Sequence, residues 1–205
     1  MVQVHVAPSF QITDSLEKPT NMVARQIYLD PYSDDWAIEF AKENALLLSL
    51  IKEWAQDIQH IGSTAIPGLA AKPVIDIMIG VKSLSEADLH CVSKIQSLGY
   101  DYIQKYEVEL PNRRYFQKTS PQGIRTHQIH LVEINSDIWK RHLLFRDYLR
   151  LHPTIAKQYE NLKKSLAETY SDTYEYANAK TTFIRNIEAK AQGKLNQRER
   201  RSRKY

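Results

Sequence analysis

Residues 60–80, with the sequence HIGSTAIPGLAAKPVIDIMIG, restrict the fold of this chain more than any other stretch. A turn of small residues at 62–64 leads through a Pro/Gly loop into strand formers at 74–79, which are apolar except for Asp76. A carboxylate inside an apolar strand is costly unless it is paired or bound to a metal. We therefore predict a functional site at Asp76. The alternative is an aspartate that points to the strand end and accepts backbone hydrogen bonds.

The composition is that of an ordinary soluble globular protein, with 42% hydrophobic and 25% charged residues among 205. The single cysteine, Cys91, excludes an internal disulfide framework and a cysteine-based zinc site. No apolar run approaches the roughly 20 residues that span a bilayer, and the first residues lack the pattern of a signal peptide. We expect a cytoplasmic protein without a membrane partner.

The chain divides by pattern into four parts. Residues 1–24 show no clear period and are predicted to form an irregular N-terminal extension. Residues 25–136 mix helices with strands and are predicted to form the core. Residues 137–193 show only helical periods and are predicted to form a helical subdomain packed on that core, whereas residues 194–205 are predicted to be a basic disordered tail. The expected fold class is α/β (α+β): a mixed β-sheet flanked by helices, with a C-terminal helical subdomain.

Basic residues of the tail account for the net charge of +4. Six Lys/Arg and one Glu give residues 194–205 a charge of +5 and leave the rest of the chain at about −1. Clustered basic residues release counterions from phosphate polymers, so nucleic acid is a candidate partner only through this tail. The alternative is a solvated tail without a partner. The sequence does not indicate an oligomeric state.

Local patterns place several elements within the core. A helix is predicted to begin near Asp35, and Ser85 is predicted to cap a second helix that ends before Gly99. Strands are predicted at 57–61, 100–103, 113–118 and 123–134, and the last two are predicted to form a hairpin. Pro153 is predicted to start a helix in the C-terminal part.

The spacing around Asp76 matches a known signature. A phosphate-binding P-loop is excluded, because five residues separate Gly62 from Gly68 and Leu69 follows. The order Ile61-Gly62-Ser63, twelve residues, then an apolar strand with Asp76 resembles the nucleotidyltransferase superfamily. The whole stretch at 60–80, with later blocks up to about residue 191, is similar to the GrpB-like family within that superfamily.

This resemblance implies a nucleotide site. Backbone N–H groups of the turn at Gly62, Ser63 and Thr64 would approach phosphate oxygens. Asp76 would bind Mg²⁺, and the implied partners are a nucleoside triphosphate and an unknown acceptor. The superfamily has a second carboxylate two residues later, where this chain has Met78, and methionine does not bind Mg²⁺.

A later strand is expected to complete the site. In THQIHLVE, alternation puts Gln128 and His130 on one face and His127 and Glu133 on the other. By the resemblance His130 faces the site as a catalytic residue and metal ligand beside Asp76, and Glu133 is kept as a candidate acid. A structural, hydrogen-bonded histidine is the alternative. Further candidates for phosphate or nucleotide binding are Lys72, Arg113, Arg114, Tyr176 and Lys180.

Three functions are compatible with these residues. The resemblance implies transfer of a nucleotidyl group from a nucleoside triphosphate to an acceptor. Met78 favours the alternative of a catalytically inactive nucleotide-binding or interaction module. A third hypothesis is a hydrolase of phosphate esters that uses His130 as general acid or base near its ordinary pKa.

Overall fold

A computed structural model describes residues 27–202 of the chain, with side chains up to residue 195. The predicted N-terminal extension at 1–24 lies outside the described residues. Five strands form one sheet in the order β1-β2-β5-β4-β3. Their bounds are β1 Ala55–Ile61, β2 Ile75–Val81, β3 Asp101–Tyr102, β4 Arg113–Thr119 and β5 Arg125–Glu133.

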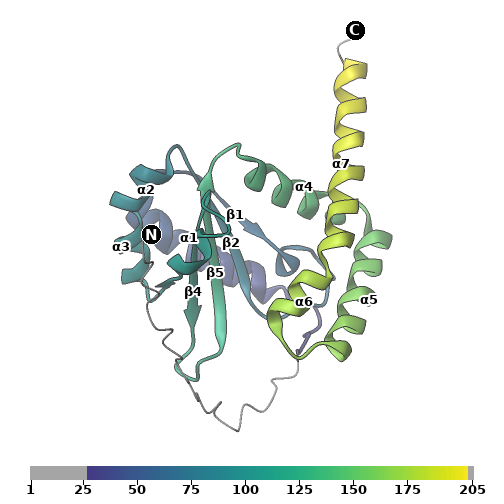
Figure 1. Cartoon of the computed structure of the whole chain (residues 1–205), viewed down its shortest axis with the longest axis horizontal. Coiled ribbons are helices and arrows are strands. Elements are labelled where there is room, and N and C mark those ends of the chain that lie inside the picture. The colour runs from purple at the N-terminus through teal and green to yellow at the C-terminus, as the bar shows by residue number, and fades with distance from the viewer. Residues whose placement is uncertain (1–26, 203–205) are drawn as a thin grey trace, which may run out of the picture.

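The sheet is mixed. Strands β2 and β5 are parallel, while β1 pairs antiparallel with β2 and β4 pairs antiparallel with both β5 and β3. The predicted hairpin between β4 and β5 is confirmed. Together with the helices on both sides of the sheet (Figure 1), this confirms the expected mixed α/β class.

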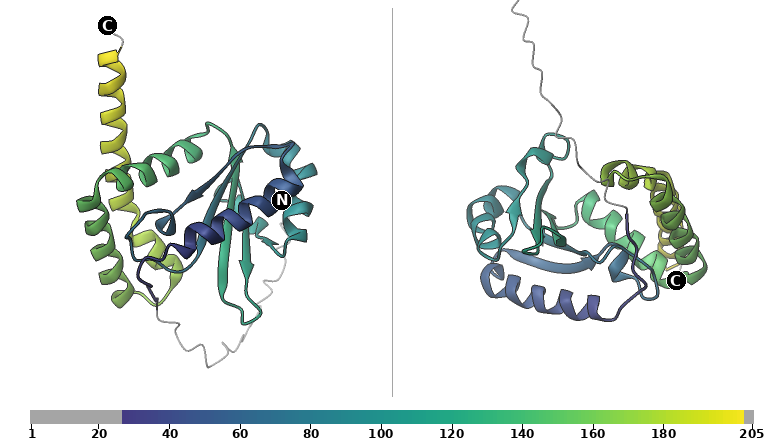
Figure 2. Two further views of the ribbon diagram at one scale, coloured as in Figure 1. Left: turned by 180° about the vertical axis from the view of Figure 1, so that it is seen from behind. Right: turned by 90° about the horizontal axis from the view of Figure 1, so that it is seen from below.

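One face of the sheet packs against the helices α1 (Asp35–Ile51), α2 (Leu84–His90) and α3 (Val92–Ser97). Figure 2 shows α1 crossing this face. Alternate residues of β2, from Ile75 to Val81, contribute to the largest buried cluster, with Leu47 and Ile51 from α1. Every second side chain of β2 therefore packs against the apolar side of α1.

The capping residue predicted for the second helix was wrong by two positions. Ser83, not Ser85, has extended backbone geometry, and its Oγ accepts a hydrogen bond from the backbone N–H of Glu86. The predicted single helix is also divided at Cys91 into α2 and α3. Gly99 follows α3 with a φ of 85°, which a glycine adopts without strain.

The second half of the chain is helical from Asp137 onward. Its helices are α4 (Asp137–Leu151), α5 (Pro153–Thr169), α6 (Thr173–Ala179) and α7 (Thr181–Ser202). They lie beside the sheet, and α7 extends away from the body (Figure 1). Residues 194–202 continue α7, so the prediction of a disordered tail was wrong there, because Lys, Arg, Gln and Glu propagate a helix well. Residues 203–205 lie outside the described residues.

Arg146 connects this helical part to the sheet. Its side chain is buried, and its guanidinium donates to Gln59 Oε1 at 2.7 Å and to the backbone oxygen of His60 at 2.9 Å. Nearby, Arg150 Nε donates to the backbone oxygen of Ala65 at 2.9 Å. Helix α4 is thereby fixed against β1 and against the turn that follows it.

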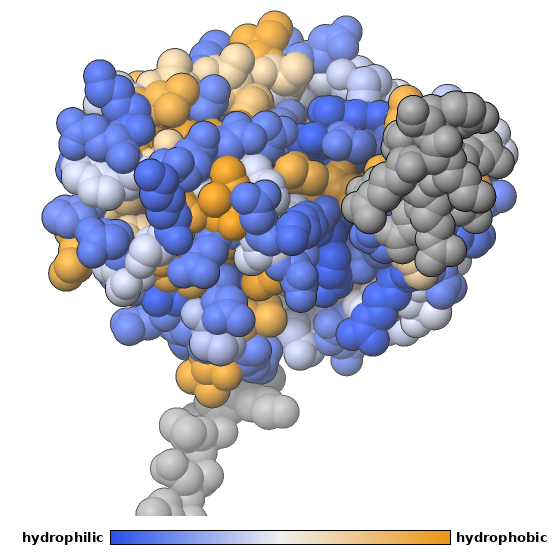
Figure 3. Space-filling model, turned by 90° about the horizontal axis from the view of Figure 1, so that it is seen from above, coloured by the Kyte–Doolittle hydropathy of each residue, from blue (hydrophilic) through white to orange (hydrophobic). Residues whose placement is uncertain are grey.

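The surface seen along the end from which α7 projects is mainly hydrophilic, with apolar side chains in small separate areas (Figure 3). Within residues 27–202, no helix combines the length and apolar character needed to cross a bilayer.

Candidate functional site

The register of the strands determines which side chains accompany Asp76. Asp76 is paired with Gln128 on β5, and Met78 is paired with His130. On β4, Tyr115 is paired with His130 and Gln117 with Gln128. Paired residues share a face of the sheet. The prediction that His130 lies on the face of Asp76 is therefore confirmed, and this face is the one opposite α1.

A cavity of about 530 Å³ opens over this face. Its walls come from the sheet, from the 3₁₀ turn η1 (Ser63–Ala65), from the region of η2 (Gln104–Glu107), and from α5 and α6. Eight of the eleven predicted site residues line it: Ser63, Thr64, Lys72, Asp76, Arg113, His130, Tyr176 and Lys180. Segments far apart in the sequence thus meet at one place.

Asp76 is held by a chain of hydrogen bonds along the sheet. Gln117 Nε2 donates to Tyr115 Oη at 3.0 Å, and Tyr115 Oη donates to Gln128 Oε1 at 2.5 Å. Gln128 Nε2 then donates to Asp76 Oδ1. Burial raises the pKa of Asp76 to about 6, opposed by the hydrogen bond from Gln128 and by the charge of Lys180. Its carboxylate is ionised at neutral pH and can accept a proton.

Gly62 makes this position of Asp76 possible. Its φ is 70°, and a Cβ atom at residue 62 would lie 2.0 Å from Asp76 Oδ2. Any larger residue would displace the carboxylate. The glycine is therefore required by Asp76, whereas Ser63 and Thr64 are the turn residues that line the cavity. Thr64 Oγ1 also donates to the backbone oxygen of Val74 at 3.2 Å, which fixes the turn to the start of β2.

Three lysines and a tyrosine form the wall near α5 and α6. The Lys72 and Lys180 ammonium groups lie 4.7 and 3.9 Å from the ring centroid of Tyr176. Lys163 is fully buried, and its Nζ donates to the backbone oxygen of Ala70 at 2.5 Å. Burial lowers the pKa of Lys163 to about 7 and that of Lys180 to about 8. Three amines therefore meet at this wall, and burial reduces the positive charge that they carry near neutral pH.

His130 lies at another part of the cavity, beside Arg113. The Arg113 Nη1 to His130 Nδ1 distance is 3.3 Å. Since arginine only donates, His130 Nδ1 accepts and the ring carries its proton on Nε2. Burial holds the pKa of His130 well below its ordinary value, with His142 and Arg113 acting in the same direction. His130 is neutral at physiological pH.

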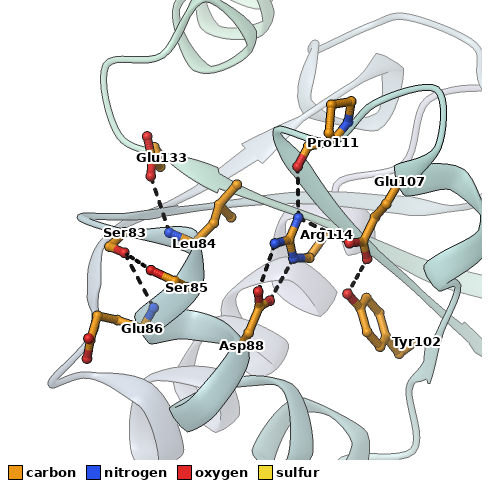
Figure 4. Close-up of polar contacts among 10 residues, drawn as sticks. All are labelled: Ser83, Leu84, Ser85, Glu86, Asp88, Tyr102, Glu107, Pro111, Arg114 and Glu133. Atoms are coloured by element: carbon orange, nitrogen blue, oxygen red, sulfur yellow. Dashed lines mark hydrogen bonds and ion pairs between the residues drawn. The ribbon is translucent and has the colours of Figure 1, made fainter.

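Two of the predicted site residues make their contacts away from the cavity (Figure 4). The Arg114 guanidinium donates to both carboxylate oxygens of Asp88, at 2.6 and 2.8 Å, and lies 3.2 Å from Glu107. Glu133 Oε1 accepts from the backbone N–H of Leu84 at 3.3 Å. Neither side chain lines the cavity. Alternation along β4 places Arg113 at the cavity and sends Arg114 to the opposite face, so of these two candidates only Arg113 lines the cavity. Glu133, kept as a candidate acid, lies on the face away from Asp76.

The comparisons with known proteins agree along most of the chain. A family model described as GrpB protein matches residues 26–190. This chain belongs to the GrpB family. The glutamate-rich protein GrpB of Alkalihalophilus pseudofirmus is 39% identical over 165 residues, which cover 79% of this chain and 94% of that protein.

Solved structures extend the GrpB comparison to the fold. The crystal structure of the conserved protein GrpB from Enterococcus faecalis has a TM-score of 0.73 and 37% identity, covering 82% of this chain and 99% of that one. The Cid1 poly(U) polymerase reaches a TM-score of 0.47 at 18% identity, covering 67% and 43%. The likeness to Cid1 is too slight to argue for a shared activity.

The residues of this GrpB cavity do not fit a Mg²⁺ ion held by the protein. Mg²⁺ requires oxygen ligands, and Met78 occupies the position of a second carboxylate while Gln128 presents its amide N–H to the one that remains. No group of three or more His, Cys, Asp or Glu side chains between residues 27 and 195 could hold a metal. The expected pair of ligands, Asp76 and His130, lies among cationic groups instead.

Several cavity residues were not predicted from the sequence. Alternation placed Gln128 on the face of His130, but its contact with Asp76 and the presence of Tyr115 beside it depend on the strand register, which no local pattern gives. Lys163 follows Leu162 within an amphipathic helix, where a lysine ordinarily faces solvent. Arg125 and Glu109 complete the charged lining.

Proposed function

We propose that the cavity binds a nucleoside triphosphate and that this GrpB family member transfers its nucleotidyl group to an acceptor. The observation that supports this most is the charge of the lining. Five cationic side chains (Lys72, Arg113, Arg125, Lys163 and Lys180) face only two acidic ones, Asp76 and Glu109. A pocket of this sign attracts a polyphosphate. The Gly62-Ser63 turn beside Asp76 is the arrangement that the resemblance to nucleotidyltransferases implies.

The chain's own residues suit the steps of such a transfer. The acceptor hydroxyl oxygen attacks the α-phosphorus, the bond to the β-phosphate oxygen breaks, and pyrophosphate leaves. Asp76, with its raised pKa, takes the proton of the acceptor hydroxyl. Lysines at the cavity wall offset the negative charge of the phosphates. His130 is neutral and carries its proton on Nε2, so in the proposed complex it can donate a hydrogen bond to a phosphate oxygen.

Binding tests the first part of this proposal. Isothermal titration with each of the four nucleoside triphosphates, in EDTA and in Mg²⁺, is expected to give saturable binding of at least one of them. The variant Lys180→Met is expected to weaken it. Absence of binding for all four at millimolar concentration would overturn the proposal.

Transfer is tested with nucleotide labelled in the α-phosphate. A low-molecular-mass extract supplies acceptors, and label transfer with stoichiometric pyrophosphate release is expected for the wild type. Asp76→Asn keeps the shape of the side chain but removes its basic oxygen, so transfer is expected to fall at least about a hundredfold, in line with general-base catalysis. An Asp76→Asn protein that transfers normally would refute the role of Asp76.

A second candidate function is a nucleotide-binding module without catalysis. The buried Met78 and the amide of Gln128, at positions where a metal site needs oxygen ligands, favour it. It predicts nucleotide binding without label transfer. The phosphate-ester hydrolase receives less support, since His130 does not keep its ordinary pKa and cannot act as a general acid at neutral pH.

A further inference from the structure

The three lysines of the cavity come from three different segments. Lys72 lies in the loop before β2, Lys163 in the third turn of α5, and Lys180 at the C-terminal end of α6. Lys72 and Lys180 both lie within 5 Å of the Tyr176 ring centroid, at 4.7 and 3.9 Å. Lys163 and Lys180 both act electrostatically on Asp76 and on each other. We call these three residues the lysine cluster.

None of the salt bridges between residues 27 and 195 includes a member of the lysine cluster. Buried charges are normally paired, because an isolated cation in a protein interior is expensive. Lys163 is 2% exposed, and the hydrogen bond that it is seen to donate goes to a neutral backbone oxygen. Glu160 acts on the charge of Lys163 more strongly than Asp76 does, but Glu160 is itself paired with Lys157 and Lys164. Asp76 also acts on Lys180, and Asp172 acts on Lys72. A positive excess therefore remains for a ligand to offset.

A second, independent observation points to a ligand at the same place. Tyr176 is 2% exposed and lines the cavity, and its Oη has no hydrogen-bond partner among the described residues. Buried hydroxyl groups without partners are rare in folded proteins. A phosphate oxygen would accept a hydrogen bond from Tyr176 Oη and pair with the ammonium groups beside its ring.

We propose that the lysine cluster takes the place of a divalent cation, so that the cavity binds polyphosphate in its metal-free form. A Mg²⁺ ion carried in with the phosphates would meet Asp76, which already accepts from Gln128, and three ammonium groups that repel it. The same ammonium groups supply the positive charge that metal-dependent sites take from Mg²⁺. This inference rests on the proposed nucleotide site and specifies the form of its ligand.

The test uses inorganic tripolyphosphate and the four nucleoside triphosphates as probes. Titration calorimetry is performed with the full chain in EDTA and again with Mg²⁺ in excess over the probe. Tripolyphosphate is expected to bind at least about tenfold more tightly in EDTA, because Mg²⁺ competes with the lysine cluster for the same oxygens. Equal or tighter binding with Mg²⁺ overturns the inference.

Substitutions of single lysines test which side chains bind tripolyphosphate. Lys180→Met and Lys72→Met are each expected to weaken binding in EDTA at least about tenfold, the effect of losing one charge-assisted hydrogen bond. Lys180→Arg keeps the charge and is expected to retain most of the affinity. Lys140→Met, at an exposed position of α4 outside the cavity, is the matched control and is expected to bind like the wild type. Thermal unfolding verifies that each variant is folded, and a folded Lys180→Met protein with unchanged affinity overturns the inference.

The two proposals fail separately. Binding of tripolyphosphate in EDTA without binding of any nucleoside triphosphate supports the lysine cluster and overturns the nucleotide function. Binding of a nucleoside triphosphate only in Mg²⁺ supports the nucleotide function and overturns the metal-free ligand. Absence of binding by every probe in both buffers overturns both.

Discussion

At the scale of single residues, Gly62 is constrained both by its backbone conformation and by the nearby carboxylate of Asp76, and these two effects can be measured separately. Its φ of 70° disfavours any side chain, and the space for a Cβ atom is already occupied by Asp76 Oδ2. Gly68 has a similar φ of 76° but nothing within 4 Å of the added atom. The difference between the two glycines therefore isolates the contact with Asp76.

We predict that Gly62→Ala lowers the free energy of unfolding by about 2–4 kcal/mol, from backbone strain and overpacking together. Gly68→Ala is expected to lower it by only about 1–2 kcal/mol, from strain alone. Urea denaturation measures both. Equal losses for the two variants would contradict a tight contact between residue 62 and Asp76.

At the scale of elements, α6 determines where two cavity side chains lie. The helix has only seven residues, Thr173–Ala179, and carries Tyr176, with Lys180 at its C-terminal end. So short a helix is marginal alone. Asp172 caps it, and its carboxylate accepts from the backbone N–H groups of Tyr174 at 2.8 Å and Glu175 at 2.9 Å. Loss of this cap would therefore destabilise α6 and displace the cavity side chains that α6 positions.

We predict that Asp172→Ala lowers the free energy of unfolding by about 1 kcal/mol and also weakens tripolyphosphate binding. Ser136→Ala removes the cap of α4, whose Oγ accepts from the backbone N–H of Trp139, and is expected to cost a similar free energy without affecting binding. Because Asp172 also acts on the charge of Lys72, Asp172→Asn, which keeps the cap, is expected to bind nearly as the wild type. Equal binding by the Asp172→Ala and Ser136→Ala proteins would contradict the coupling.

At the scale of the whole molecule, the lysine cluster couples stability to pH. The folded-state pKa values of Lys163, about 7, and Lys180, about 8, lie below the ordinary value of 10.5. Between these values the unfolded chain binds more protons than the folded one. Stability therefore rises with pH in this window, because deprotonation relieves the buried charge.

We predict that the free energy of unfolding rises by about 1 kcal/mol per lysine between pH 7 and 8.5. This range lies below the ordinary pKa of Cys91 and of the buried tyrosines, whose raised pKa values act in the opposite direction at higher pH. Lys163→Met is expected to reduce this pH-dependent increase in the free energy of unfolding, whereas Lys140→Met is expected to leave it unchanged. Urea titrations at several pH values measure the slope, and a stability independent of pH in the wild type would contradict the buried state of these lysines.

Local signals were enough for most elements of the fold. The apolar run of β2, the strand formers of β5, the helical period after Asp35, and Pro153 at the start of α5 gave the element types and their order. Boundaries were less certain where residues of equal capping ability compete, as with Ser83 and Ser85. At residues 194–202 charge indicated disorder, yet helix propensity prevailed.

The sequence by itself predicted that Asp76 and a glycine turn lie together at a candidate site, because their spacing and the burial of β2 follow from residues close in the chain. It also determined that His130 and Gln128 share a face, because alternation along a strand is local. Only the tertiary structure decided that Gln128 donates to Asp76, that Arg113 rather than Arg114 reaches the cavity, and that Lys163 is buried beside them. These facts depend on strand register and on how α5 packs against the sheet, and such contacts join residues that are from about 40 to 90 positions apart and that no local pattern relates.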